Sequence, residues 1–308
     1  MPAVQSAPVR PTNPPFCAEY SRTADEQLFG TVKPIDLWLL IEFRGRWEHE
    51  AVSVFSPTVQ LRIKSLRSQF SKFRLALIKQ TQRTRGPCKM FWAFSREQKS
   101  ILYQTEFIDI ENVSFEPDNL RVESAEPLYA VCTHGTHDLC CAQFGNKIFA
   151  ELSSLHNNAW QISHIGGCRF APNVVCLPDG AVYGRVEQRD IAAIINSSQH
   201  SSVFLPKLRG RSCLAKPVQA AEYFVRKSTN LLHLDELILA DAGEIEPGKW
   251  GVTFHSNTAR TMFQVSLHLE ETQIRTFKSC ATTEPSFRES FHLDNLQTTG
   301  LGQKTSST

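Results

Sequence analysis

The segment from Leu128 to Val186 concentrates soft and borderline metal ligands, and this density limits the possible folds and functions more than any other feature. It holds five of the nine cysteines and four of the ten histidines: Cys132, Cys140, Cys141, Cys168, Cys176, His134, His137, His156 and His164. Thiolates and imidazoles bind zinc and iron–sulfur clusters, and thiolates are also nucleophiles. The segment therefore predicts either a metal centre or a reactive thiol.

The rest of the chain indicates that these cysteines stay reduced. Residues 1–22 contain several prolines and no apolar stretch typical of a secretory signal, so we expect a disordered leader and a cytoplasmic protein. In a reducing compartment cysteines are more often metal ligands, catalytic thiols or core residues than disulfides. Four cysteines are isolated in the sequence and are interpreted as buried or incidental thiols: Cys17, Cys88, Cys213 and Cys280.

The net charge and the length of the apolar runs argue against two classes of partner. The formal charge of +2 offers no polybasic field for a nucleic acid. No apolar run approaches the length needed to span a bilayer. We therefore expect neither a nucleic acid nor a membrane as a partner.

Residues 23–125 are predicted to form an N-terminal α/β segment with the order β-α-β-β-β. Ser56 followed by Pro57 marks the start of a helix that runs to Gln69. Apolar runs typical of buried strands lie at residues 36–43, 73–79, 90–94 and 100–107. The acidic stretch Glu111–Glu126 contains a proline and is the expected domain boundary.

Residues 126–200 have the element order of a small thioredoxin-like domain, β-α-β-β-β-α. One strand ends at Cys132 and the next leads to His164. Between them, Asp138 is a good N-cap for a helix over Cys140–Leu155. The Asp179-Gly180 turn between two apolar runs predicts a hairpin, which a short amphipathic helix follows.

The remainder of the chain is predicted to be a C-terminal α+β segment, residues 201–296, and a disordered tail, residues 297–308. Its expected helices cover residues 217–227 and 230–240, and its expected strands cover residues 249–255, 261–270 and 272–279. The fold class expected for the whole chain is therefore mixed, α+β or α/β.

Two pairs of residues in the central domain are the strongest candidate ligands. Cys132 pairs with Cys140 or Cys141 across the loop between the first strand and the helix, and His164 pairs with Cys168 after the second strand. Both pairs are expected at one edge of the sheet near a helix N-terminus, where the helix dipole favours thiolates. Three thiolates and one imidazole complete the ligand set of a [2Fe–2S] cluster.

Three functions stay open on the residues alone. An iron–sulfur cluster would make the protein an electron carrier, the same donors would hold structural zinc in a binding module, and the thiols could serve an oxidoreductase. The chain lacks a C-x-x-C motif and any Rossmann or P-loop glycine pattern, so electrons would have to come from a partner protein. His134 and His137 are interpreted as solvent-facing loop residues, with hydrogen bonds to cluster sulfurs as the alternative, and Cys176 as a packing residue.

The motifs CTHGTHDLCC, SHIGGCRFAPNV and LPDGAVYGRV resemble the sucrase/ferredoxin-like family, and the resemblance covers roughly Ala24 to Arg226. It implies a thioredoxin-like ferredoxin that binds one [2Fe–2S] cluster through two cysteines and two histidines. Three family ligands match Cys132, Cys141 and His164. At the fourth, this chain has Cys168 instead of histidine. The resemblance implies an electron carrier with a reductase or acceptor as partner, and this Cys168 predicts a lower reduction potential than in such a relative.

Overall fold

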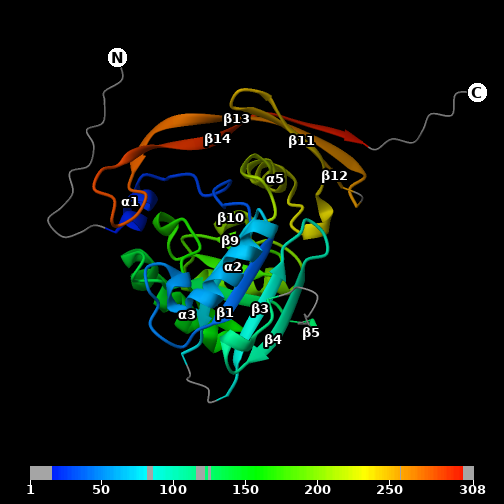
Figure 1. Ribbon diagram of the computed structural model, residues 1–308. Coiled ribbons are helices and arrows are strands. Elements are labelled where there is room, and N and C mark those ends of the chain that lie inside the picture. The colour runs from blue at the N-terminus through cyan, green and yellow to red at the C-terminus, as the bar shows by residue number, and fades with distance from the viewer. Residues whose placement is uncertain (1–15, 82–85, 116–121, 124–125, 257, 301–308) are drawn as a thin grey trace, which may run out of the picture.

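The protein has a mixed α/β architecture, as its sequence predicts. A computed structural model describes residues 16–81, 86–115, 122–123, 126–256 and 258–300. These residues form a ten-stranded mixed sheet and a four-stranded antiparallel sheet. The smaller sheet arches over one side of the molecule with helix α5 (Lys216–Thr229) beneath it (Figure 1). No helix in the described residues is long and apolar enough to cross a membrane.

The ten-stranded sheet contains two halves with matching strand arrangements. Its order is β10-β9-β8-β6-β7-β2-β1-β3-β4-β5. In each half, two parallel strands joined by a helix are followed by antiparallel neighbours. The strands are β1 (Leu37–Glu42), β2 (Phe73–Lys79), β3 (Cys88–Phe94), β4 (Ile101–Phe107), β5 (Val122–Glu123), β6 (Leu128–Cys132), β7 (Ala159–Ile162), β8 (Val174–Leu177), β9 (Ala181–Tyr183) and β10 (Leu208–Arg211). The antiparallel pair β2–β7 joins the halves.

The first half confirms the predicted order β-α-β-β-β. All six residues of β1 are buried, because Leu39 packs on the face near helix α2 (Pro57–Gln69) while Leu40 packs in the core on the opposite face. A strand covered on both faces reads as a continuous apolar run. Helix α2 begins as expected, since the Ser56 hydroxyl accepts a hydrogen bond from the Val59 amide at 3.3 Å.

The second half also follows the predicted order. Asp138 caps helix α3 (Leu139–Leu155), and its carboxylate accepts a hydrogen bond from the Cys140 amide at 2.9 Å. Strands β8 and β9 form the predicted hairpin around the Asp179-Gly180 turn. Helix α4 (Ile191–Gln199) follows it. The parallel pair β6–β7 places Cys132 opposite Ile162, so both strands end at the same edge.

Two predictions on the N-terminal and C-terminal segments are wrong. Part of the expected leader forms helix α1 (Cys17–Thr23), in which Cys17 and Ala18 are buried in the core; residues 1–15 lie outside the described part. The expected helix over residues 230–240 is instead a 3-10 turn (Leu234–Glu236) followed by strand β11 (Ile238–Glu246). Pairing of β11 with β12 overrides the helical pattern of this stretch.

The four-stranded sheet differs from the prediction in its last two strands. Strand β12 (Lys249–Ser256) is as expected, but β13 (Thr261–Thr276) is one long strand with an irregularity between Glu271 and Arg275, where two strands were predicted. Strand β14 (Ser286–Gly300) includes residues 297–300, which were assigned to the disordered tail. Residues 301–308 lie outside the described part. Long antiparallel pairing with β13 orders these polar residues.

A buried ion-pair triad anchors helix α5 to the ten-stranded sheet. The Glu222 carboxylate lies 3.3 Å from a guanidinium nitrogen of Arg211 and 2.9 Å from one of Arg226. All three side chains are buried. Burial opposes the charge of Glu222, but the two guanidinium groups outweigh it and lower the pKa of this carboxyl. The other face of α5 packs under the apolar side of the four-stranded sheet.

Candidate metal centre

The structure brings all four predicted ligands together at one edge of the ten-stranded sheet. Cys132 ends β6, Cys141 lies in the first turn of α3, His164 follows β7, and Cys168 opens a 3-10 turn (Cys168–Phe170). The donor atoms of Cys132, Cys141 and His164 lie within 4.8 Å of one another. The Cys168 sulfur lies 3.3 Å from Nδ1 of His164.

The adjacent cysteines of the doublet point into different groups. Cys141 shares one group with Cys132 and His164, and another with Asp138 and Cys168. Cys140 instead lies with Cys17 and Cys280. Consecutive residues on a helix do not face the same neighbour, so the doublet supplies one thiol to each group. The choice between Cys140 and Cys141 that the sequence leaves open therefore has a geometric preference for Cys141.

Hydrogen bonds and charge within the group favour an anionic sulfur. The hydrogen bond from Cys141, followed by the contact with His164, holds the pKa of Cys132 well below its ordinary value despite burial. Burial opposes the charge of His164, but Cys132 and Cys168 together raise the pKa of this imidazole to about 9. The hydrogen bond with Cys141 likewise lowers the pKa of Cys168. Burial opposes this effect, but the pKa of Cys168 is still below its ordinary value. Anionic sulfur is the form that binds metals.

Two arginines, Arg209 buried and Arg74 partly buried, supply positive charge beside the donors. Arg209 is fully enclosed, and burial lowers its pKa to about 9 although the nearby Cys168 and Cys132 thiolates favour its charged form. Its guanidinium donates to the Gly166 carbonyl at 3.1 Å and to the Asn173 side chain at 2.9 Å. Arg74 donates to the His164 carbonyl. Both cations are therefore fixed by the loop that carries His164 and Cys168.

Gly167 lets this loop pass close to Arg209. Its φ of +75° lies in the left-handed region, and a Cβ there would lie 2.4 Å from a guanidinium nitrogen of Arg209. Gly166 also has a positive φ, +96°, but a Cβ there would meet nothing within 4 Å. Gly167 is therefore required by contact and by conformation, and Gly166 by conformation alone. The loop through Gly166 and Gly167 and the four donor side chains therefore fit a metal group with three thiolate ligands and one imidazole ligand.

The prediction that His134 faces solvent is wrong, because the side chain is buried. Its Nδ1 accepts a hydrogen bond from the His164 amide at 3.0 Å, and its Nε2 donates to the Glu48 carbonyl at 2.8 Å. This pattern fixes the neutral tautomer with the proton on Nε2, and burial lowers the pKa of His134. His134 therefore positions the backbone of His164, a role that only its nearness in sequence to the ligands could have suggested.

A cleft of about 240 Å³ reaches the histidine side of the group. Its lining includes His164, His137, Arg74 and Arg67. His137 is half-buried and stacks on His164 with ring centroids 3.7 Å apart. Burial, and next the charge of His164, lower the pKa of His137 to about 4. Of the four donors, His164 is therefore the one that lines an approach from outside.

Cys176 has the surroundings of a packing residue. It is buried in β8 and belongs to the core cluster between the sheet and helices α3 and α4. Burial raises the pKa of this thiol. Cys88 in β3 and Cys213 after β10 are partly buried and belong to none of the ligand groups found among the described residues. Cys17 and Cys280, by contrast, are isolated in the sequence, but in the structure they lie in one group with Cys140.

Comparisons with known proteins agree with the resemblance seen in the sequence. The chain is similar to "Altered inheritance of mitochondria protein 32" of Meyerozyma guilliermondii, with 29% identity over 124 residues. That alignment covers 36% of this chain and 43% of the relative, so the match spans less than half of either protein. No solved structure gives a significant match. The profile of the sucrase/ferredoxin-like family matches residues 28–210, which include all four donors and more than half of the chain. The chain therefore belongs to the sucrase/ferredoxin-like family.

Proposed function

We propose that this protein is an electron carrier that binds one [2Fe–2S] cluster. Cys132 and Cys141 would hold one iron, and His164 and Cys168 the other. The observation that carries this proposal is the convergence of three thiols and one imidazole from separate elements at one buried sheet edge. Membership of the sucrase/ferredoxin-like family supports it.

The strand arrangement supports a thioredoxin-like assignment for the half that carries these donors. Its elements follow the order β6, α3, β7, β8, β9, α4, and its strands lie in the order β9-β8-β6-β7. Strand β8 alone runs antiparallel to the other three. In such a unit the ligand-bearing loop and the N-terminus of the first helix lie at the same edge, and the helix dipole favours negative charge there.

The bound cluster would supply one-electron transfer, and the surrounding residues would adjust its energy. Three thiolates give the group a more negative charge than two would. The guanidinium groups of the partly buried Arg74 and the buried Arg209 offset this charge and favour uptake of an electron. His164 lines the cleft, and we propose that a reductase or an acceptor protein approaches from that side.

Two other functions from different classes are less well supported. A dithiol oxidoreductase built on the adjacent Cys140 and Cys141 is disfavoured, because these two thiols lie in different groups and the chain lacks a C-x-x-C motif. A zinc-binding module would use the same four donors equally well, so donor chemistry alone does not separate zinc from iron. Family membership favours the iron–sulfur assignment. The expected cytoplasmic location stays a prediction.

Metal analysis of anaerobically purified protein tests the proposal. We expect a red-brown protein with about two irons and two sulfides per chain. Cys132→Ser, Cys141→Ser, His164→Ala and Cys168→Ser should each reduce iron content or shift the visible spectrum. Cys88→Ser is the matched control, because this thiol lies in the other half of the sheet and belongs to no ligand group of the described residues. A protein that takes up zinc at these four residues and no iron after anaerobic reconstitution would overturn it.

A further inference from the structure

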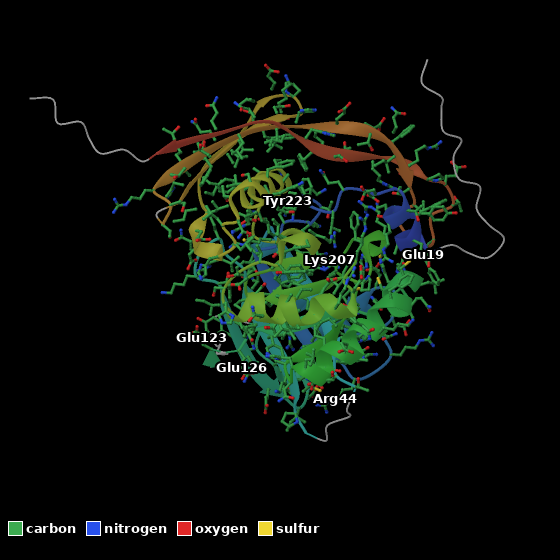
Figure 2. All side chains as sticks on the ribbon, turned by 180° about the vertical axis from the view of Figure 1, so that it is seen from behind. Glu19, Arg44, Glu123, Glu126, Lys207 and Tyr223 are labelled. Atoms are coloured by element: carbon green, nitrogen blue, oxygen red, sulfur yellow. The ribbon has the colours of Figure 1, made fainter. Side chains whose placement is uncertain are left out.

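A second group of sulfur ligands joins three distant parts of the chain. Cys17 comes from α1, Cys140 from the first turn of α3, and Cys280 from the connection between β13 and β14. Asp138, the N-cap of α3, completes the group. Figure 2 shows α1, marked by Glu19, beside the end of the four-stranded sheet at which that connection lies. The sequence gives no sign of this group, because Cys17 and Cys280 are 263 residues apart.

The three sulfurs form a triangle close to, and on two sides smaller than, the one that tetrahedral zinc requires. The Cys140 sulfur lies 3.5 Å from that of Cys17 and 3.2 Å from that of Cys280, and the third side is 3.8 Å. Zinc–sulfur bonds of about 2.3 Å at tetrahedral angles place two ligand sulfurs about 3.8 Å apart. All three distances are well above the roughly 2.05 Å of a disulfide bond. Thiolates about 0.3 and 0.6 Å further apart on two sides would therefore form one face of a metal tetrahedron.

Asp138 lies where the fourth ligand would be. Its two carboxylate oxygens are 4.0 and 3.9 Å from the Cys17 sulfur. Each oxygen accepts one backbone hydrogen bond, from the amides of Cys140 and Cys280, both at 2.9 Å. A carboxylate oxygen has two lone pairs, so each can accept a hydrogen bond and still bind a metal. The two amides hold the carboxylate in place beside the sulfurs.

The surroundings exclude water and direct one backbone donor at the sulfurs. Cys17, Cys140 and Asp138 are buried, and Cys280 is partly buried. The Ala18 amide lies 3.4 Å from the Cys140 sulfur and donates to it, as amides do around metal-bound thiolates. Cys140 also lies in the first turn of the 17-residue helix α3, where the helix dipole favours negative charge. Soft thiolates with one carboxylate and tetrahedral spacing favour Zn²⁺ over Mg²⁺ or Ca²⁺.

We propose that Cys17, Cys140, Cys280 and Asp138 bind one structural Zn²⁺. Binding replaces the three thiol protons, which pass to solvent, by three zinc–sulfur bonds. The ion ties α1 and the β13–β14 connection to the N-terminus of α3. It thereby fixes both segments against the first turn of α3, which also carries Cys141. It also holds the Cys140 sulfur away from the group formed by Cys132, Cys141, His164 and Cys168. The site uses none of the four residues proposed to hold the iron–sulfur cluster.

Zinc and iron measured on the same samples of the full chain test this site separately from the cluster. Protein produced in zinc-supplemented medium and purified without oxygen should contain about one zinc per chain besides its iron. Cys17→Ser and Cys280→Ser should bring zinc close to zero and leave the visible spectrum of the iron centre in place. Cys132→Ser should do the reverse. Cys213→Ser, at a partly buried thiol outside the ligand groups of the described residues, is the matched control.

Cobalt gives a second readout that does not depend on iron. Co²⁺ added to metal-depleted Cys132→Ser protein should produce thiolate-to-cobalt absorption and the visible bands of tetrahedral Co²⁺. A further Cys280→Ser change should abolish both. Circular dichroism shows whether each variant is folded, and Cys280 is the safer position because it is partly exposed in a loop. Zinc content that is unchanged in Cys280→Ser, or mass spectrometry that finds a Cys140–Cys280 disulfide in the native protein, would overturn the proposal.

Discussion

Replacement of Cys168 by histidine should raise the reduction potential of the proposed cluster by roughly 0.2 V. The change removes one thiolate charge from a site in which Cys168 is buried and lies 3.3 Å from His164. Two unit charges about 4 Å apart interact by about 4 kcal/mol at an effective dielectric constant of about 20. An electron added to the cluster would therefore be less strongly repelled by about this amount, and for one electron each 59 mV corresponds to about 1.4 kcal/mol.

The trend known for iron–sulfur proteins has the same direction. Exchange of two cysteines for two histidines on one iron raises the potential from about −400 mV to between about −150 and +300 mV. A second imidazole should also steepen the pH dependence, because a reduced cluster of more negative charge favours a protonated ligand. The potential of Cys168→His should therefore rise more steeply than that of the natural protein as the pH falls.

Anaerobic potentiometric titration at several pH values measures both effects, with Cys88→Ser as the control of unchanged potential. Iron analysis and the electron paramagnetic resonance spectrum of the reduced protein establish that each sample holds the cluster. A fully loaded Cys168→His protein whose potential and pH slope equal those of the natural protein would refute the reasoning. Cys168 would then not be a ligand.

Three further changes test other parts of the structure. In urea titrations, Glu222→Gln should lower the free energy of unfolding by about 3–5 kcal/mol, because it leaves two buried guanidinium groups without a counter-charge. The control Glu246→Gln, at an exposed ion pair, should lower it by at most about 1 kcal/mol. Because the pKa of Glu222 is lowered in the folded protein, its contribution to the free energy of unfolding should be complete above the unfolded pKa of about 4.3 and should disappear as the pH falls through the folded pKa. The natural protein should therefore lose more stability in acid than Glu222→Gln does, and an equal loss would contradict this reasoning. Gly167→Ala should lower the thermal midpoint and the iron content, whereas Gly243→Ala, at an uncrowded position without a positive φ, should change neither. Arg74→Gln should lower the reduction potential of the loaded protein, and an unchanged or higher value would exclude this cation as a source of the field at the cluster.

The sequence predicts most strands of the ten-stranded sheet because their signals are local, but it does not predict that the two halves join into one sheet through β2 and β7. Strand β1 is a continuous apolar run, and the N-caps Ser56 and Asp138 mark two helix starts by side chains that bond their own helices. The placement of the candidate ligands follows from the same information, since Cys132 ends β6 and His164 follows the neighbouring parallel strand β7. Local chemistry therefore suffices for most strands and for bringing the four candidate ligands to one edge, but not for the β2–β7 pairing that joins the two halves.

The features missed in the sequence depend on contacts between distant residues. Cys17 and Cys280 meet only after α1 and the β13–β14 connection have packed against the start of α3, and no local sequence pattern predicts that contact. The stretch after Asn230 has helical spacing, but its residues become part of a sheet through pairing with β12. His134 looks like a loop histidine until its two ring nitrogens are seen bonded to Glu48 and His164.

The β2–β7 seam has a consequence for attempts to isolate the donor-bearing half. Ile78 and Lys79 of β2 pair with Ile162 and Gln161 of β7, and the Ser163 hydroxyl accepts a hydrogen bond from the Leu77 amide at 2.9 Å. A fragment cut at residue 126 would lose these partners and expose an apolar strand edge, which is a template for aggregation. The two halves should therefore be produced as one polypeptide, and substitutions in β2 should impair the proposed metal centre, to which β2 contributes no ligand.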